Sequence, residues 1–361
     1  MNNFPTVAII GCVGVPAQYG GWETLAQQLV TQLNKEVEFT VACSGPREKT
    51  GFFYELNCYR AFYPIRANGI SSIFYDSISL IDLNRKANIL LVLGTSGAIC
   101  LPLIRALNKK VIILGCPDGI EWRREKWGIF ARYFLKFSEY LMIKFSHKIV
   151  CDNIEIQRYI YQRYNLLGEL IAYGGDHVIV QNKYLETVSD NYAFTVCRIE
   201  PENNIHLILE AFAQITEHKL IIVGNWDYST YGKNLRKKYK KFKQIQMLDP
   251  IYDQVELDKL RANATIYVHG HSAGGTNPSL VEAMYLGLPI VAFDCEFNRR
   301  TTDDMCVYFS SSSDLKNIIR TLSPKDWENI AVACREYAIN TYNWKSISEK
   351  YLVIFKKFFS K

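Results

Sequence analysis

Residues 264–293 constrain the fold of this chain more than any other segment. They read as a strand (264–268), a glycine-rich loop, a helix that opens near Asn277-Pro278, and a second strand (289–293). Backbone N–H groups at such a helix start point outward with the positive end of the helix dipole, so they suit a phosphate. Glu282 lies about one turn inside, where a carboxylate can accept hydrogen bonds from vicinal hydroxyls. The segment favours a nucleotide-sugar site, although an ordinary strand–loop–helix unit also uses glycines for tight turns.

Apolar runs alternate with helical patterns in the order expected of doubly wound α/β domains. The expected strands are 7–11, 38–43, 89–93, 111–115, 148–152 and 171–173 in a first domain, and 192–197, 219–223, 245–247, 266–268, 290–292 and 306–309 in a second. A chain of 361 residues, 48% hydrophobic and 22% charged, can bury two such cores. We expect domains at 1–178 and 190–341, a linker at 173–190, and a C-terminal amphipathic helix at 342–361.

Ten scattered cysteines form no C-x-x-C pair, and several lie inside apolar runs, as in a reduced, cytoplasmic protein. Residues 1–5 lead straight into a core strand, so we expect no signal peptide. The most apolar window, 89–104, is interrupted by glycines and hydroxyl side chains and is too short for a membrane span.

Basic and aromatic side chains interleave between residues 122 and 148, as expected of a surface that meets anionic headgroups. This stretch contributes to an uneven distribution of the net charge of +6. A core helix with a solvated basic face fits the same pattern. The residues concerned are Trp122, Arg123, Arg124, Lys126, Trp127, Phe130, Arg132, Tyr133, Phe134, Lys136, Phe137, Tyr140, Lys144, Phe145 and Lys148.

A second glycine-rich loop follows the first strand, at residues 11–24, and runs into the helical spacing of Leu25, Leu29 and Leu33. Such a loop can bring backbone amides close to an anion at the helix start. Its glycines do not give G-x-G-x-x-G, and no suitably placed acidic residue ends the next strand, which argues against a dinucleotide-dependent oxidoreductase. In the first domain, Asp118 and Glu121 are paired carboxylates just beyond the strand 111–115, where open α/β sheets bind ligands.

The segment around Glu282 resembles the donor-binding signature of the GT-B retaining glycosyltransferases of the GT4 family. Glu282 matches the second Glu of their Glu-x7-Glu motif, whereas Gly274 stands at the first, which leaves the sugar hydroxyls to Asn277 or backbone amides. Residues 274–280 resemble one branch, the bacterial rhamnosyltransferases of capsule or cell-wall polysaccharide, with a DUF1972-type N-terminal domain. The resemblance implies donor binding by Gly274, Gly275, Thr276, Asn277 and Glu282.

Residues 197–206 resemble the GT4 block in which an Arg and usually a Lys neutralise the donor pyrophosphate. Arg198 matches the Arg, and Asn203 stands where the Lys would be, so diphosphate binding depends more on Arg198 and helix amides. We expect donor binding by both residues and a catalytic role for Arg198 on the leaving diphosphate. A surface pair of Arg198 with a neighbouring glutamate is the alternative.

In the first domain, the resemblance implies roles in acceptor and phosphate binding for Gly20, Gly21, Glu23, Glu121 and Trp122. Similar rhamnosyltransferases carry an Asp-Gly-x-Glu-Trp block, and here Asp118 begins it. Asp118 is therefore the candidate catalytic residue at the acceptor hydroxyl, as base or orienter. The alternative is a cap on a helix beginning near Ile120.

Taken with the residues above, the resemblance implies an α/β GT-B fold: two Rossmann-like, doubly wound parallel-sheet domains facing a cleft, with the C-terminal helix returning to the first. It implies a hexosyltransferase that moves L-rhamnose from dTDP-L-rhamnose, with retention, onto lipid-pyrophosphate-linked glucose or N-acetylglucosamine at the cytoplasmic face of the membrane. A UDP-sugar donor and a catalytically silent nucleotide-sugar-binding protein of the same fold are the alternatives.

No metal or other cofactor is expected. His269 and His271 have H-x-H spacing, but no carboxylate or cysteine accompanies them locally, and they are better suited to line the sugar pocket. In GT-B enzymes, side chains and helix dipoles meet the pyrophosphate charge. The lysine-rich run 233–243 is interpreted as a solvated face, because nucleic-acid binding would need a recognised module.

Overall fold

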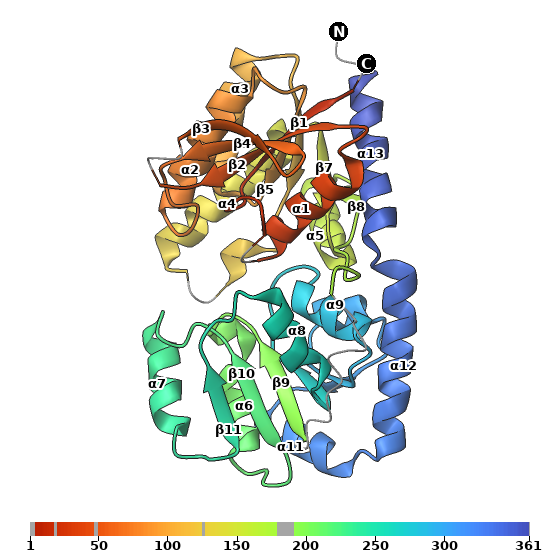
Figure 1. The fold of residues 1–361 in the computed structure, drawn as a ribbon. Coiled ribbons are helices and arrows are strands. Elements are labelled where there is room, and N and C mark those ends of the chain that lie inside the picture. The colour runs from red at the N-terminus through yellow and green to blue at the C-terminus, as the bar shows by residue number, and fades with distance from the viewer. Residues whose placement is uncertain (1–3, 18–19, 47–49, 125–126, 179–190, 361) are drawn as a thin grey trace. The chain divides into compact units, whose positions relative to one another are not determined.

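The computed structural model describes residues 4–17, 20–46, 50–124, 127–178 and 191–360 (Figure 1). The chain divides into two compact units. The first contains Met1–Arg123, Trp127–Tyr173 and Trp344–Lys361, and the second contains Arg124–Lys126 and Gly174–Asn343. Of the predicted linker, residues 179–190 lie outside the described residues, as does Lys126 of the basic stretch.

The first unit is an eight-stranded sheet in the order β3-β4-β2-β1-β5-β6-β7-β8. All neighbouring strands are parallel except β3 and β4. Its strands are β1 (Thr6–Ile10), β2 (Glu38–Ser44), β3 (Gly51–Glu55), β4 (Cys58–Tyr63), β5 (Ile89–Leu93), β6 (Ile112–Cys116), β7 (Lys148–Cys151) and β8 (Glu169–Leu170). Its helices are α1 (Gly21–Leu33), α2 (Ser71–Leu83), η2 (Ser96–Cys100), α3 (Leu101–Leu107), η3 (Glu121–Arg123), α4 (Ile129–Phe145), α5 (Ile154–Tyr164) and α13 (Trp344–Phe359).

Two features of this sheet differ from the sequence prediction. The antiparallel pair β3–β4 was not predicted, because its two-residue turn, Leu56-Asn57, lacks the usual glycine even though both residues have positive φ angles of 55° and 62°. The last strand, β8, lies at Glu169–Leu170 rather than at 171–173.

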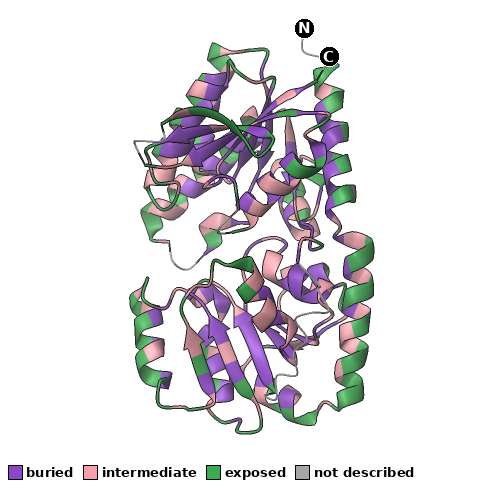
Figure 2. Ribbon diagram, viewed as in Figure 1, coloured by how far each residue is buried: buried purple, intermediate pink, exposed green. Residues whose placement is uncertain are grey.

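Helices cover both faces of the first sheet. On one face, Val7 and Ile9 of β1 pack in a cluster with Leu29 of α1 and with Trp344 and Phe355 of α13. The intervening residues Ala8 and Ile10 are also fully buried, as expected of a parallel sheet covered twice. A separate layer is formed by α2, η2 with α3, and α4, which pack against one another in that order. Figure 2 shows the central strands of the sheet mostly buried, the edge strand β3 exposed and these helices partly exposed.

The second unit is a six-stranded parallel sheet in the order β11-β10-β9-β12-β13-β14. Its core contains Phe212, Leu220 and Trp226. Its strands are β9 (Tyr192–Val196), β10 (Lys219–Val223), β11 (Ile245–Leu248), β12 (Ile266–His269), β13 (Ile290–Phe293) and β14 (Val307–Phe309). Its helices are η5 (Pro201–Asn203), α6 (Ile205–Phe212), α7 (Thr230–Tyr239), α8 (Gln254–Ala262), α9 (Pro278–Tyr285), α10 (Glu296–Thr302), α11 (Ser312–Thr321) and α12 (Pro324–Thr341).

The ten cysteines are all free thiols. Across the part of the chain that the structure describes, no helix has both the length and the apolar character needed to cross a membrane.

Candidate active site

The strand order of the second unit places a ligand site at β9 and β12. β9 lies between β10 and β12, so the order of connection reverses there. Ligands of open α/β sheets bind beyond the carboxyl ends of the strands at such a point. The segments that leave these two strand ends are 197–204 and 270–277. They contain all of the predicted donor-binding residues except Glu282, which follows on α9.

Side-chain hydrogen bonds join the two segments. Asn203 donates from Nδ2 to the carbonyl of Arg198 at 2.6 Å, and its Oδ1 lies 2.7 Å from Nδ1 of His271. Asn204 donates to the carbonyl of Gly270, and the N–H of Ser272 donates to the carbonyl of Glu202. The residue at the family's Lys position therefore fixes the shape of the loops, while the Arg198 side chain is exposed beside them.

The helix that follows the glycine loop starts as predicted. Asn277 is the N-cap of α9, and its Oδ1 accepts hydrogen bonds from the N–H and the hydroxyl of Ser279 at 3.1 and 2.8 Å. Pro278 takes the first helical position, where its missing N–H has no cost. The sequence predicts that the first-turn amides and the helix dipole bind an anion here, and the structure provides the helix start that this prediction requires.

The Glu282 carboxylate lies between an arginine and a histidine side chain. It is 9% exposed, and its Oε2 lies 2.8 Å from Nη2 of the fully buried Arg261 on α8. Its Oε1 lies 3.2 Å from Nε2 of His177. Arg261 in turn contacts Asp258 at 3.2 Å, and Asp258 accepts from Gln254. Sequence reasoning missed Arg261 and His177, because their contacts with Glu282 join distant parts of the chain that share no local motif.

These contacts set the charge of Glu282. Burial raises the pKa of a carboxyl group, but the Arg261 guanidinium and the His177 ring outweigh it, so the net pKa of Glu282 is lowered. An ionised carboxylate has about four lone-pair sites. Arg261 and His177 use two of them, so Glu282 keeps the capacity to accept from two hydroxyls.

The backbone explains why the first Glu of the family motif is absent. Gly274 has φ +113°, a conformation that residues with a Cβ rarely adopt, and a Cβ there would lie 3.2 Å from Nε2 of His271. A glutamate at this position would therefore be strained.

His269 ends β12 and is buried. Burial lowers its pKa to about 3, so the ring is neutral, and it stacks on Tyr267. Its Nε2 has no hydrogen-bond partner among the described residues. Nowhere in residues 4–17, 20–46, 50–124, 127–178 and 191–360 do three or more His, Cys, Asp or Glu side chains gather as metal ligands.

Side chains of helix α1 accept hydrogen bonds from the backbone of the first unit's glycine loop. Glu23 is buried, and its Oε1 accepts from the N–H of Val13 at 2.7 Å. Gln27 accepts from the N–H of Ala17 at 2.6 Å. Gly20 has φ +98°, and a Cβ there would meet Oε2 of Glu23 at 2.8 Å. Gly20, Gly21 and Glu23 thus lie together at the end of β1, with Glu23 bonded to the loop's own backbone.

Asp118 lies just after β6, half-buried, beside Gly119 with φ +61°. The helix near Ile120 in the capping alternative is the short 3-10 helix η3, and the next helix of the described chain, α4, begins at Ile129.

Glu121 and Trp122 belong to a hydrogen-bonded network. Glu121 Oε1 accepts from the indole N–H of Trp127 at 3.1 Å, and Trp122 donates to the hydroxyl of Tyr159 at 3.2 Å. The Tyr159 and Tyr164 hydroxyls both donate to the buried Glu139 on α4, at 2.7 and 2.6 Å. These contacts fix the loop that carries Asp118.

A further buried carboxyl group was not predicted. Asp76 on α2 is 4% exposed, and its Oδ1 has no hydrogen-bond partner within the described residues. Burial raises its pKa to about 8. It lies against Gly97 of η2, where an added Cβ would meet the Asp76 Cβ at 2.6 Å.

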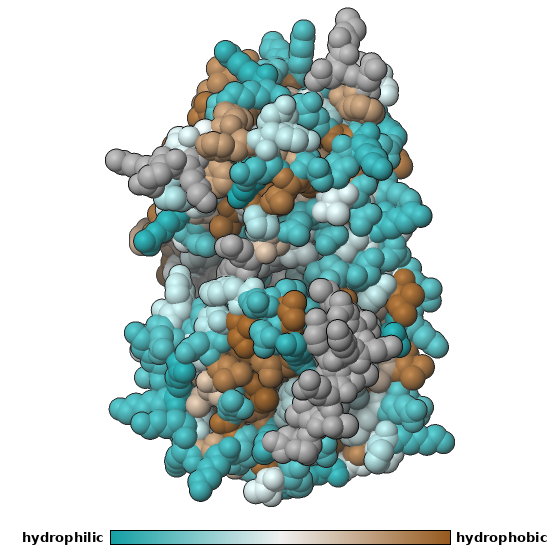
Figure 3. Space-filling view, in the orientation of Figure 1, coloured by the Kyte–Doolittle hydropathy of each residue, from teal (hydrophilic) through white to brown (hydrophobic). Residues whose placement is uncertain are grey.

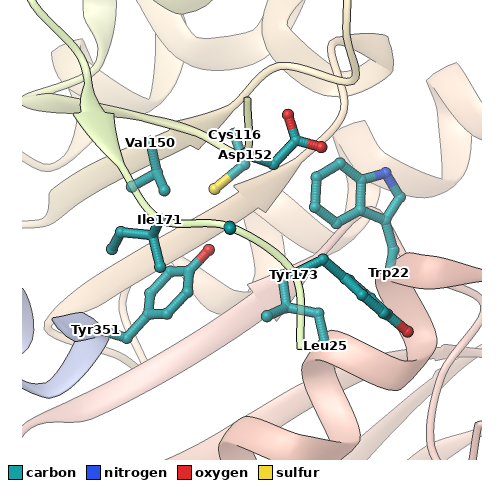
Figure 4. A pocket seen from close by; sticks show the side chains of 9 residues that line it. Trp22, Leu25, Cys116, Val150, Asp152, Ile171, Tyr173 and Tyr351 are labelled. Atoms are coloured by element: carbon teal, nitrogen blue, oxygen red, sulfur yellow. The ribbon is translucent and has the colours of Figure 1, made fainter. Parts of the chain in front are cut away.

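A small cavity lies inside the first unit, at the carboxyl ends of β6 and β7. Figure 4 shows it between side chains that include Trp22, Asp152 and Tyr351. Its volume is about 20 Å³, which is room for roughly one water molecule. It is far too small to hold a sugar.

Two family models match the sequence. Residues 4–176 match the domain of unknown function DUF1972, and residues 179–339 match Glycosyl transferases group 1. No curated protein matches the chain.

Solved structures match nearly the whole chain. Sucrose-phosphate synthase from Thermosynechococcus elongatus has a TM-score of 0.83 at 15% identity, with 99% of each chain covered. A glycosyltransferase from Rickettsia africae has a TM-score of 0.72 at 13% identity, again with 99% of each chain covered. HepE of Anabaena, in complex with UDP and glucose, has a TM-score of 0.73 at 13% identity, covering 98% of this chain and 100% of that one.

The solved structures establish the GT-B fold, so the predicted fold class is confirmed. The group 1 match defines the class of protein, a glycosyltransferase that acts as a hexosyltransferase, and the predicted enzyme class is confirmed as well. More particularly, the chain is GT4-like, with a DUF1972 segment over most of its first unit and a Glycosyl transferases group 1 segment in its second.

Proposed function

We propose that the protein is a retaining glycosyltransferase that moves L-rhamnose from dTDP-L-rhamnose onto lipid-pyrophosphate-linked glucose or N-acetylglucosamine, at the cytoplasmic face of the membrane, in polysaccharide biosynthesis. The observation that carries the proposal is the switch point of the second sheet. The loops that follow β9 and β12 are joined there by hydrogen bonds. These loops, the N-terminus of α9 and the ionised Glu282 all lie within the group 1 segment.

The charge and the hydroxyl groups of a nucleotide-sugar donor are complementary to these protein groups. The amides at the start of α9 and the exposed Arg198 suit a diphosphate, and Glu282 suits the hydroxyls of a nucleoside sugar. HepE, which shares the fold, was solved with UDP and glucose, so a UDP-sugar is the second candidate donor. Neither donor needs a metal in this proposal, because side chains and helix amides meet the diphosphate charge.

In the transfer step, the oxygen of the acceptor hydroxyl bonds to C1 of rhamnose on the face that the leaving group occupies. The bond from C1 to the diphosphate oxygen breaks, and its electron pair stays on dTDP. The hydroxyl proton passes to Asp118 if Asp118 is the base, or to the departing diphosphate if Asp118 only orients the acceptor. Arg198 stabilises the charge that grows on the diphosphate.

A panel of donors and acceptors tests the proposal. The protein is incubated with dTDP-, UDP- and GDP-sugars and with short-chain lipid-pyrophosphate glucose or N-acetylglucosamine, and product masses are read. We expect a rhamnosylated lipid from dTDP-L-rhamnose. If only a UDP-sugar gave a product, the proposed donor would be wrong and the proposed reaction class would stand.

The rival is a silent nucleotide-sugar-binding protein, suggested by Gly274 and Asn203 at the positions of family Glu and Lys residues. Donor hydrolysis separates the two, because an enzyme slowly releases free sugar from its true donor. A protein that binds donors but neither hydrolyses nor transfers any of them would be a binder.

A further inference from the structure

The outer surface of α2 is apolar, unlike that of an ordinary surface helix. Ile70, Phe74, Ile78 and Ile81 follow one another at helical spacing and are 79%, 62%, 44% and 44% exposed. The opposite side of the same helix buries Tyr75, Leu80 and Leu83. A helix in a soluble protein normally presents polar side chains to water, so both sides of α2 have the character of a contact surface.

The two neighbouring helices repeat this pattern. η2 packs against both α2 and α4, and α3 packs against α4, so the three form one layer. Their exposed apolar residues are Ile99, Leu103 and Leu107 on η2 and α3, and Ile129, Phe130, Tyr133, Phe137 and Tyr140 on α4. We call these eight residues and the four of α2 the docking face. Figure 3 shows brown, apolar surface along the edge of the first unit where Figure 1 draws α2 and α3. Exposed apolar side chains gathered on neighbouring helices in this way indicate an interaction site.

The exposed charges on the segments that carry the docking face are mostly positive. The basic residues of residues 71–110 and 129–146 are Arg85, Lys86, Arg105, Lys109, Lys110, Arg132, Lys136 and Lys144. The acidic residues of the same segments are Asp76, Asp82 and Glu139. Asp76 and Glu139 are buried, and Asp82 pairs with Lys86. The exposed charge is therefore positive, and it complements an anionic surface.

We propose that the docking face binds the surface of an anionic lipid bilayer, with its Phe, Ile and Leu side chains in the headgroup and acyl boundary and its basic residues against the phosphates. This inference rests on the proposed function, since a lipid-linked acceptor brings the enzyme to a membrane. It extends the surface well beyond the basic stretch 122–148, to α2 and α3, and makes apolar insertion a main part of binding. Salt therefore weakens binding without abolishing it, because salt screens charge but does not expel buried apolar groups.

The experiment measures binding of the full chain to phosphatidylcholine vesicles with and without phosphatidylglycerol, at low and high salt, with no sugar donor or acceptor. The test variant combines Phe74→Ser, Leu103→Ser and Phe130→Ser, one on each helix. The control combines Val332→Ser, Ile339→Ser and Val353→Ser, which are similarly exposed on α12 and α13. All six side chains are exposed, so circular dichroism and the melting temperature should stay unchanged.

We expect the wild-type protein and the control to bind the anionic vesicles, and the test variant to lose binding by about tenfold or more at both salt concentrations. Reversing Arg132, Lys136 and Lys144 to Glu should weaken binding at low salt and change it little at high salt. Equal binding by the test variant and the control, or no binding by the wild type, would overturn the proposal. So would a wild-type dimer that the test variant converts to a monomer in sedimentation velocity, because a second copy would then cover the face. If the protein binds vesicles but transfers no sugar, the docking-face proposal stands and the proposed function is rejected.

Discussion

Two buried carboxyl groups, one from each unit, can be compared, because the pKa of Glu282 is lowered and the pKa of Asp76 is raised. Glu282 in the second unit is ionised, because Arg261 and His177 outweigh the cost of its burial. Among the described residues, Asp76 in the first unit has no such partner, and burial raises its pKa to about 8. Burial therefore does not decide whether a carboxyl group is charged; its partners do. Glu282 is therefore a charged hydrogen-bond acceptor on α9, and Asp76 is a neutral acid on α2.

The largest expected effect concerns the exposed guanidinium of Arg198, on the loop that follows β9. Arg198→Ala should lower turnover by about 100-fold, because charge on the diphosphate grows toward the transition state. Donor affinity should fall much less, and the fold should be unaffected because the side chain is exposed. Steady-state kinetics and calorimetry measure the two quantities. A variant with normal turnover and weakened donor binding would contradict this role.

Glu282→Gln should weaken donor binding by roughly tenfold to a hundredfold. A charge-assisted hydrogen bond contributes about 1.5–3 kcal/mol, and the neutral amide loses that assistance. Arg261 keeps its contact with Asp258, so the variant should fold. Glu256→Gln, on the exposed side of the neighbouring helix α8, is the control. If calorimetry shows an unchanged nucleotide affinity, Glu282 does not bind the ribose.

The pH dependence of stability should separate the two carboxyl groups. The folded pKa of Asp76 lies above its unfolded value of about 3.9, so its contribution to stability is present below that pH and is lost as pH rises toward 8. The pKa of Glu282 is lowered, so its contribution is present above its unfolded pKa and is lost in acid. Asp76→Asn should therefore stabilise the protein at pH 8, by on the order of 1–3 kcal/mol, and should not help at pH 4.

Urea unfolding at both pH values measures this difference. Asp82→Asn, on the same helix but at a partly exposed position paired with Lys86, is the control and should show no such gain. Destabilisation of Asp76→Asn at pH 8 would mean that the carboxylate is needed in the folded state.

The smallest expected effect tests the missing family residue. Gly274→Glu restores the glutamate but places a side chain at φ +113°, which costs about 1–2 kcal/mol of stability. The melting temperature should fall, and donor affinity should not rise. Gly128→Ala is a useful reference, because nothing lies within 4 Å of a Cβ there. Tighter donor binding by the Gly274 variant would show that the loop can adopt the family's conformation.

Features that depend on local sequence patterns, such as strands and helix starts, could be predicted from the sequence. Ile89–Leu93 is a continuous apolar run, as a strand buried on both faces requires, and Asn277-Pro278 gave the start of α9. The pairing of Arg261 with Glu282 and the burial of Asp76 could not be predicted, since they depend on contacts between distant elements. The part of the docking face on α2 and α3 was also missed: spacing shows that Ile70, Phe74 and Ile78 share one side of α2, but not whether anything covers that side.

The contrast between the units can be tested in one measurement, hydrogen exchange of the backbone amides read by mass spectrometry. The chain is measured alone, with dTDP-L-rhamnose, and with phosphatidylglycerol vesicles. We predict that the donor slows exchange in residues 198–204 and 270–285 and leaves α2 and α3 unchanged, and that the vesicles slow exchange in α2, α3 and α4 and leave residues 270–285 unchanged. Donor protection confined to the first unit, or vesicle protection confined to the second, would contradict the account.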